Sequence, residues 1–403
     1  MSSTPSVATG TTSFDLTVTG GRPIDDPQPD QDIDLDIVGG RIAGRVAGQR
    51  HTTGTGTAVL DASECIIAPG CIDLQLNGGW GVDFTSQPQR IREVARRLPA
   101  TGVTSFLPTV ITSSPATTAR AVTTLSAAST RHHGEARSLG IHLEGPYLNP
   151  LRKGAHPPHH LRLPSIEEAG RWSAAAGVAM VTLAPELAGA LELIAVLRAN
   201  GVVVSAGHTA ADAEELRISI DAGISAATHL YNAMGPFGGR EPGTVGPLLA
   251  NRAIVTGLIV DGLHVDPIMV DVAWRARGPR GIALVTDAIT ALGAGYGAFG
   301  IGDTEIIVDE TGARMSTGIL AGSVLRMDEA VRNLIAFTGC SLADALVAAS
   351  TTPAILLGRS DLGNLLVGSI ADLVLLDGAH DVVATVIDGE VVYDPQQRFS
   401  PAR

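Results

Sequence analysis

Four residues with metal-binding or acid-base side chains each follow a short apolar run in this 403-residue chain. Glu144 comes after SLGIHL, His208 after VVVSAG, His229 after SAAT and Asp287 after IALVT. Two imidazoles and one carboxylate form the ligand set of many catalytic zinc hydrolases, which keep one position open for water. The residue types therefore predict a metal centre, provided that the fold brings these positions together.

The elements that must position these residues alternate between strand-like and helix-like segments from about residue 69 to residue 357. Apolar runs of strand length are separated by stretches such as TAADAEELRISIDAG, in which apolar residues recur every three or four positions. This alternation is typical of parallel βαβ units, and about eight of them close a (β/α)₈ TIM-type barrel of the α/β class. The expected strands are 72–77, 103–110, 138–144, 178–186, 202–208, 225–230, 254–262 and 282–288.

In such a barrel the carboxyl ends of all strands meet on one face. The four residues end strands three, five, six and eight, so we expect them to meet there. Each histidine alone is more simply explained as a hydrogen-bonded barrel residue, but several potential ligands at equivalent strand positions favour a metal centre. The single lysine of the chain, Lys153, lies in the loop after Glu144 and not at a strand end. Glu144 is therefore the best candidate for an anionic ligand.

Both ends of the chain contain short alternating runs around hairpin-type turns. Gly39-Gly40 separates DIDLDIV from RIAG, and Asp388-Gly389 separates ATVI from EVVYD; both dipeptides suit two-residue hairpins. Neither terminal piece is long enough to bury its own sheet face, so we expect the two to pack together. The expected domains are a disordered tail at 1–12, a small β-sandwich domain at 13–68 plus 358–403, and the catalytic barrel at 69–357.

The composition restricts the location and the partners of the protein. A formal net charge of −13 argues against broad contact with nucleic acid or an anionic membrane, because both require clustered cations. The three cysteines form no CxxC pair and leave an odd thiol, which favours a reducing compartment. No uncharged apolar run approaches the roughly 20 residues of a membrane span, and no signal-peptide pattern is present. We expect a cytoplasmic protein.

Several motifs around the candidate residues occur in a distinctive order. They are HLEGPYLNPLRKGAH, SAGHTAADAEE, THLYNAM followed by GREPG, GLIVDGLHVDP and LVTDAI. Together they resemble the N-acetylglucosamine-6-phosphate deacetylases of the amidohydrolase superfamily, and the similarity extends from PGCIDLQLNGG to the terminal ADLVLLD. The resemblance implies a barrel with a small β-sandwich, usually a homodimer, which removes the acetyl group of an amino-sugar phosphate to release acetate.

The same resemblance assigns roles in the chemistry. It implies that Glu144, His208 and His229 are the metal ligands, that His156 polarises the amide carbonyl of the substrate, and that Asp287 is the catalytic acid and base. From the residues alone, His156 also fits a solvated loop histidine. Asp287 also fits a partner that orients a ligand histidine.

The resemblance further implies the contacts with the substrate. Asn232, the backbone at Ala233 and His264 match sugar-phosphate contacts, and Arg240 matches an arginine that reaches the phosphate across a dimer interface. On its own, Arg240 in GPFGGREPG fits an ordinary surface arginine equally well. Phosphate nevertheless needs a bidentate cationic partner in an otherwise acidic protein, which favours the functional role.

One departure concerns the end of the first barrel strand. Many amidohydrolases carry HxH there, where both imidazoles bind a second metal, but this chain has Gln75-Leu76-Asn77. Neutral amides are poor substitutes for imidazole toward a transition metal. We therefore expect one strongly bound divalent metal ion per subunit, with Zn²⁺ as the first choice and Fe²⁺, Co²⁺ or Mn²⁺ as alternatives.

Three alternatives remain open from the sequence. The nearest is deacetylation of another amino-sugar phosphate, such as N-acetylgalactosamine 6-phosphate, because no motif reports the orientation of one hydroxyl. A wider alternative is hydrolysis of N-acyl amino acids or cyclic amides, against which the absent HxH and strand-end lysine count. The third is an inactive metal-binding or regulatory protein, against which the complete set of candidate residues counts.

Overall fold

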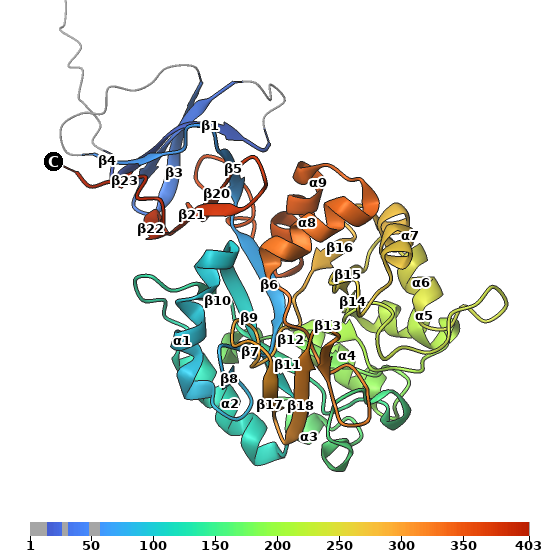
Figure 1. The fold of residues 1–403 in the computed structure, drawn as a ribbon. Coiled ribbons are helices and arrows are strands. Elements are labelled where there is room, and N and C mark those ends of the chain that lie inside the picture. The colour runs from blue at the N-terminus through green and yellow to red at the C-terminus, as the bar shows by residue number, and fades with distance from the viewer. Residues whose placement is uncertain (1–13, 26–30, 48–56, 403) are drawn as a thin grey trace, which may run out of the picture.

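The computed structural model describes residues 14–25, 31–47 and 57–402. A large α/β body carries a smaller β part at one end, and this part is built from the first and last strands of the chain (Figure 1). The expected tail at residues 1–12 lies outside the described residues.

Eight parallel strands form the barrel, in the order β6-β9-β11-β12-β13-β14-β15-β16. Hydrogen bonds join its first and last strands, because the N–H of Asp287 donates to the carbonyl of Gln75 at 2.9 Å and the N–H of Asn77 donates to that of Ala288 at 2.8 Å. The expected fold class is confirmed. The strands are β6 (Cys71–Leu76), β9 (Val103–Ile111), β11 (Ile141–Glu144), β12 (Val178–Leu183), β13 (Val203–Ala206), β14 (Ile224–Ala227), β15 (Val255–Leu258) and β16 (Ile282–Leu284), with the short β10 (Arg137–Ser138) beside β9.

Helices cover the outside of this barrel (Figure 1). Side chains that accept hydrogen bonds from the first turn start several of them: Asp212 and Glu215 form a capping box at α5, and the hydroxyl oxygen of Ser341 accepts from the N–H of Asp344 at α9. The helices are α1 (Ile91–Ala95), α2 (Pro115–Ala127), α3 (Ile166–Ala169), α4 (Ala190–Ala199), α5 (Ala213–Ala222), α6 (Val245–Ala250), α7 (Pro267–Arg277), α8 (Met327–Thr338), α9 (Leu342–Leu346) and α10 (Thr352–Leu356).

The terminal strands form a separate, mostly antiparallel sheet in the order β22-β21-β20-β5-β1-β2-β3, with β4 beside β1 and β23 beside β4. Strand β20, from the end of the chain, pairs with β5, so the two ends share one sheet and one apolar core. Both expected hairpin turns are present, with positive φ at Gly39, Gly40, Asp388 and Gly389. The strands are β1 (Leu16–Pro23), β2 (Ile33–Val38), β3 (Arg41–Ala47), β4 (Ala58–Asp61), β5 (Ile66–Pro69), β20 (Leu373–Leu376), β21 (Val382–Ile387), β22 (Glu390–Tyr393) and β23 (Phe399–Ser400).

The segment IGDTEIIVDETGARMS (301–316) predicts a β-hairpin after the last barrel strand, and the structure has a small three-stranded sheet there. It consists of β17 (Gly297–Ile301), β18 (Thr304–Asp309) and β19 (Gly312–Arg314), and it begins earlier than the sequence indicates. Its apolar face packs on Ile111 and Ile289 from the barrel. A second short pair, β7 (Gly78–Gly79) and β8 (Val82–Asp83), follows strand β6.

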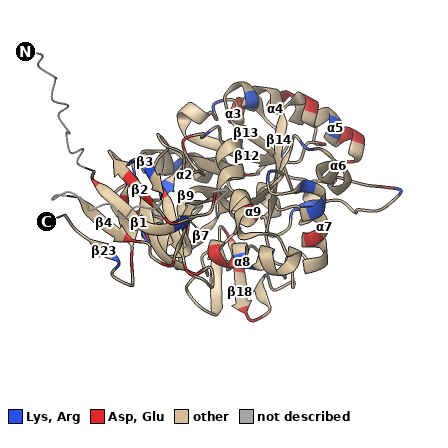
Figure 2. Ribbon diagram, turned by 90° about the horizontal axis from the view of Figure 1, so that it is seen from above, with Lys and Arg blue, Asp and Glu red and all other residues tan. Residues whose placement is uncertain are grey.

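The apolar core is mainly aliphatic, and the outer helices carry many of the exposed charged residues. Acidic and basic residues occur side by side on α5 and α7 (Figure 2), where Arg217 pairs with Glu214 and Arg275 pairs with Asp271. Among the described residues, no helix combines the length and the apolar character needed to cross a membrane.

Candidate active site and metal centre

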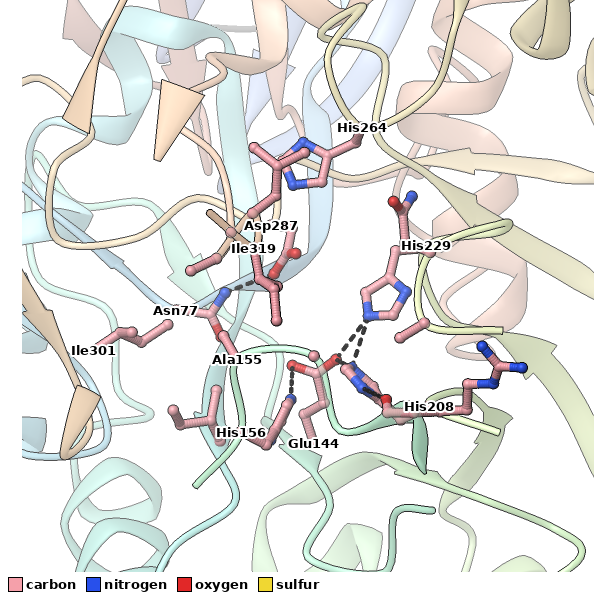
Figure 3. A pocket seen from close by; sticks show the side chains of 18 of the residues that line it. Asn77, Glu144, Ala155, His156, His208, His229, His264, Asp287, Ile301 and Ile319 are labelled. Atoms are coloured by element: carbon pink, nitrogen blue, oxygen red, sulfur yellow. Dashed lines mark hydrogen bonds and ion pairs between the residues drawn. The ribbon is translucent and has the colours of Figure 1, made fainter. Parts of the chain in front are cut away.

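A cavity of about 300 Å³ lies at the carboxyl ends of the barrel strands (Figure 3). Its volume is at the lower end of the range for small-ligand sites, about 300–1,000 Å³. Every site residue predicted from the sequence lines it, except Arg240. The barrel therefore brings together side chains that are far apart along the chain.

Three of these residues leave their strands in a left-handed backbone conformation. The φ angle is 49° at His208, 30° at His229 and 49° at Asp287, shortly after β13, β14 and β16 respectively. This conformation costs L-residues roughly 1–2 kcal/mol each, and such outliers cluster at functional sites. The resulting turn directs all three side chains toward the same space (Figure 3).

Glu144, His208 and His229 place three ligand atoms in a nearly equilateral triangle. Nε2 of His208 and Nε2 of His229 each lie 3.1 Å from Oε1 of Glu144, and the two nitrogens lie 3.0 Å apart. All three side chains are buried. Burial disfavours the charged form, but hydrogen bonds from the two imidazoles hold the pKa of Glu144 well below its usual range. The centre therefore contains a carboxylate.

The protonation of His208 fits a metal ligand. Its Nδ1 lies 2.9 Å from the carbonyl oxygen of Arg152, which can only accept, so Nδ1 carries a proton and Nε2 is the ring nitrogen that faces the triangle, where a metal ion would take the place of a proton on it. Ligand atoms of a tetrahedral site with bonds of about 2.1 Å are about 3.4 Å apart. The observed triangle is close to that size, so these residues fit a divalent metal ion.

His156 lies beside the same centre and needs to be distinguished from a ligand. Its Nε2 is 3.7 Å from the other oxygen of Glu144, Oε2, and its ring stacks edge-on against His208. Nδ1 of His156 lies 2.9 Å from the hydroxyl oxygen and 3.4 Å from the amide nitrogen of Thr112, so Nε2 is the ring nitrogen that faces Glu144. Burial lowers the pKa of His156 to about 3. His229 meets both other atoms of the triangle at 3.1 and 3.0 Å, so it fits the third ligand position better than His156 does.

Two amides from the first strand hold Asp287. Nδ2 of Asn77 donates to Oδ1 of Asp287 at 2.7 Å, and Nε2 of Gln75 donates to the same oxygen at 3.1 Å and to Oε1 of Glu144 at 3.1 Å. Burial, with the nearby charge of Glu144, raises the pKa of Asp287 to about 6. The Gln-x-Asn pair thus orients two carboxylates, a role that imidazoles bound to a metal would not fulfil.

The predicted sugar-phosphate residues lie farther out in the cavity. Asn232 and Ala233 follow His229 in the loop after β14 and line the wall. His264 donates from Nδ1 to Oδ2 of Asp261 at 2.7 Å. Burial opposes ionisation of Asp261, but the bond from His264 lowers its pKa. This pairing directs Nε2 of His264 away from Asp261 and makes it available to a ligand.

Arg240 is not part of the cavity of its own chain. It is exposed in the loop between β14 and α6, which projects from the barrel (Figure 1). Phe237 in the same loop is 49% exposed. Any contact between Arg240 and a substrate would therefore be made from this projecting loop.

Sequence reasoning missed the groups that orient the candidate residues. Thr112 hydrogen-bonds to His156, Asp261 pairs with His264, and the carbonyl of Arg152 binds His208. The D-x-x-H spacing of Asp261 and His264 is a usable signal for the second pair. No signal in the residue types marks the other two, because one is a buried threonine and the other is a backbone carbonyl.

The fold and the cavity define a barrel hydrolase of the amidohydrolase class, and the profile of the amidohydrolase family matches residues 66–392. The chain is 42% identical over 384 residues to human N-acetylglucosamine-6-phosphate deacetylase, covering 89% of this chain and 91% of that protein. It is 38% identical over 338 residues to the Bacillus subtilis enzyme of the same name, covering 82% and 85%. The chain belongs to the N-acetylglucosamine-6-phosphate deacetylase family.

Solved structures agree with this placement. One is a variant of N-acetyl-D-glucosamine-6-phosphate deacetylase from Mycobacterium smegmatis in complex with N-acetyl-D-glucosamine-6-phosphate. It superposes with a TM-score of 0.86 at 33% identity, and the match covers 95% of this chain and 100% of that chain. The deacetylase from Pasteurella multocida superposes with the same TM-score of 0.86 at 30% identity, covering 93% and 99%.

Proposed function

We propose that this protein removes the N-acetyl group from N-acetyl-D-glucosamine 6-phosphate to give D-glucosamine 6-phosphate and acetate. The supporting observation is that the metal-binding set of Glu144, His208 and His229 and the carboxylate of Asp287 share one cavity. An acetamide is a poor electrophile, and its amine leaves badly unless it is protonated. Hydrolysis therefore needs a nucleophile, a partner for the developing oxyanion and a proton donor.

Glu144, His208 and His229 would hold one divalent ion, with Zn²⁺ as the first choice because two imidazoles and a carboxylate suit it. Such an ion, when bound, lowers the pKa of a water molecule to about 7 and so makes hydroxide available at neutral pH. The second-metal position of other amidohydrolases is filled by amides that already donate to carboxylates. One tightly bound ion per subunit follows from this arrangement.

Asp287 is assigned the proton transfers. Its Oδ1 is held by Gln75 and Asn77, which leaves Oδ2 to take the proton of the attacking water. The same carboxyl group then returns that proton to the sugar nitrogen as the C–N bond breaks, and acetate leaves. General acid-base groups of this kind contribute about 10²–10⁴-fold to the rate.

His156 is assigned the oxyanion. Its Nε2–H donates to the acetyl carbonyl oxygen and stabilises the negative charge that develops there during attack. The contacts of Nδ1 with Thr112 hold the ring with Nε2 toward the cavity, so the donor needs no reorganisation. Loss of one such donor typically costs about 10²–10³-fold in rate.

The phosphate is assigned to His264, Asn232 and Ala233 within the chain and to Arg240 of a second copy. The projecting loop of Arg240, with exposed Phe237, is suited to reach a neighbouring subunit, which supports a homodimer. A bidentate guanidinium is the preferred partner for a phosphate group. We also place the protein in the cytoplasm, in agreement with its three free cysteines.

Measurement of acetate release from a set of substrates distinguishes the proposed deacetylase activity from the alternative activities. The substrates are N-acetylglucosamine, its 6-phosphate, the galactosamine 6-phosphate epimer, an N-acetyl amino acid and a cyclic amide, each with and without a chelator. We expect chelator-sensitive release that is fastest with N-acetylglucosamine 6-phosphate. Faster turnover of the epimer or of an unphosphorylated amide would replace the proposed substrate, and no release from any of them would indicate an inactive protein.

A further inference from the structure

A second cluster of potential metal ligands lies outside the cavity. Nε2 of His160 is 3.2 Å from Oδ2 of Asp303, and Nε2 of His159 is 3.9 Å from the same oxygen. The centroids of the two imidazole rings are 4.1 Å apart. One ligand atom from each residue lies within 4.8 Å of the other two. Two imidazoles and one carboxylate have the same chemistry as the buried centre.

The cluster joins two segments that both line the cavity. His159 and His160 belong to the short helix η4 (Pro158–His160), which begins directly after the loop that carries His156. Asp303 lies in the turn between β17 and β18, two residues after Ile301 of the cavity wall. A contact between these segments therefore lies at the rim of the active site.

The two sides are already held in place. On the hairpin side, the N–H of Gly302 donates to Oδ2 of Asp83 at 3.0 Å, and the hydroxyl of Thr304 donates to the carbonyl of Ala155 at 3.4 Å. On the other side, the carbonyl of His160 accepts from Arg162 at 2.8 Å. Because the backbone is already ordered, little conformational freedom is lost when a ligand binds, which favours binding.

The carboxylate of Asp303 is available to a cation. Within the described part of the chain, its ion-pair partners are the two histidines, with no arginine or lysine. A comparable surface pair differs in this respect: Glu390, beside His133, is already paired with Arg131. Uncompensated negative charge next to two imidazoles favours a divalent cation.

We propose that His159, His160 and Asp303 form a second, exposed site for a borderline transition-metal ion, with Zn²⁺ as the reference ion. The ion fastens the turn of the β17–β18 hairpin to η4 at the rim of the active site. Exposed fractions of 64% for the side chain of His159 and 66% for that of Asp303 leave room for water ligands. The site is therefore weaker than the buried centre, and occupancy depends on the free zinc concentration.

Zinc binding is measured directly, without substrate, so the test is independent of the proposed deacetylase activity. Enzyme whose buried centre is already loaded is titrated with Zn²⁺ by calorimetry and equilibrium dialysis. Wild type is expected to bind one further equivalent, and the double variant His159→Gln/His160→Gln and the single variant Asp303→Asn are expected to bind it at least about tenfold more weakly.

The matched control is His132→Gln/His133→Gln, which removes two adjacent surface histidines from the loop after α2. It is expected to bind the further equivalent as wild type does. Equal binding by wild type and by the His159/His160 and Asp303 variants would overturn the site. Loss of the additional Zn²⁺ equivalent in the control variant would also overturn the proposed site.

Hydrogen exchange tests the fastening of the hairpin. Zinc in excess of one equivalent is expected to slow amide exchange in residues 297–309 of wild type and to leave the two site variants unchanged. It is also expected to reduce turnover of wild type more than that of the variants, because substrate must pass the fastened rim. Binding without any change in hairpin exchange would leave the site but overturn its role as a fastener.

Discussion

The side-chain amide of Asn77 donates a 2.7 Å hydrogen bond to Oδ1 of Asp287. This bond joins the first and last strands of the barrel at the centre of the active site, next to the backbone bonds that close the barrel. The carboxylate of Asp287 is therefore positioned by the contact between the first and last strands, which also closes the barrel. Rotation of Asp287 would require breaking bonds to both Asn77 and Gln75.

The first prediction concerns proton transfer by Asp287. Asp287→Asn preserves the shape of the side chain but removes the base, so we expect kcat to fall by about 10²–10⁴-fold. Metal content, measured by elemental analysis, should stay at the wild-type level. Asp221→Asn, on the surface of α5, serves as the control and should retain full activity. Activity of Asp287→Asn within tenfold of wild type would exclude the proposed role.

The second prediction concerns the metal ligands. His229→Gln and Glu144→Gln each remove one corner of the triangle, so both variants should lose the tightly bound ion and nearly all activity while keeping the wild-type circular dichroism. His264→Gln lies in the same cavity but outside the triangle, and it should keep the ion. Elemental analysis of wild type should give one ion per chain. Two tightly held ions per chain would contradict the proposal that Gln75 and Asn77 do not bind a second metal ion.

The third prediction concerns phosphate recognition. Arg240→Ala should raise KM for the phosphorylated substrate far more than it lowers kcat, because the guanidinium is proposed to contact the phosphate and not the reacting amide. With unphosphorylated N-acetylglucosamine the variant and wild type should behave alike. Arg252→Ala, another exposed arginine of the barrel, is the control. An unchanged KM for the phosphorylated substrate would remove Arg240 from the phosphate site.

The fourth prediction concerns stability at acid pH. His142 is fully buried between the carbonyl of Leu74 and the hydroxyl of Thr182, and burial lowers its pKa from 6.5 to about 4. Between these values the unfolded chain binds a proton that the folded chain does not. The stabilisation is therefore complete above pH 6.5 and is lost as the pH falls toward 4, by about 3 kcal/mol in total.

The measurement is urea unfolding of metal-free wild type and His142→Asn across this pH range. The amide of asparagine can still donate to the carbonyl of Leu74 but does not titrate. Wild type should lose more unfolding free energy than the variant as the pH falls. Parallel curves for the two proteins would show that His142 is not the titrating group.

The barrel strands were predictable because parallel strands buried on both faces appear as continuous apolar runs. VAMVTL became β12, and VTSFLPTV lies within β9. The last strand was expected at 282–288, but β16 ends at Leu284. Residues that point into the active site leave the strand, and Asp287 does so with a left-handed backbone. Hydrophobic periodicity does not indicate where the strand ends and the left-handed turn begins.

The convergence of the candidate ligands was predictable from topology alone, since strand order fixes which ends share a face. The orienting contacts of His156 and His208 were not, because they depend on a buried threonine and on one loop carbonyl. The start of β17 also escaped prediction, because AGYGAFG has no alternation of apolar and polar residues. The proposed contribution of Arg240 would come from a neighbouring subunit, which the sequence of one chain does not position.

The pairing of β5 with β20 has a consequence for synthesis. These two strands are separated by some three hundred residues, since β5 ends at Pro69 and β20 begins at Leu373. During translation, β5 therefore emerges long before its partner, and its edge is open to other chains until the end of synthesis. The barrel between them can form first. Loss of even the last thirty residues would leave a complete barrel attached to a sheet with an unprotected edge.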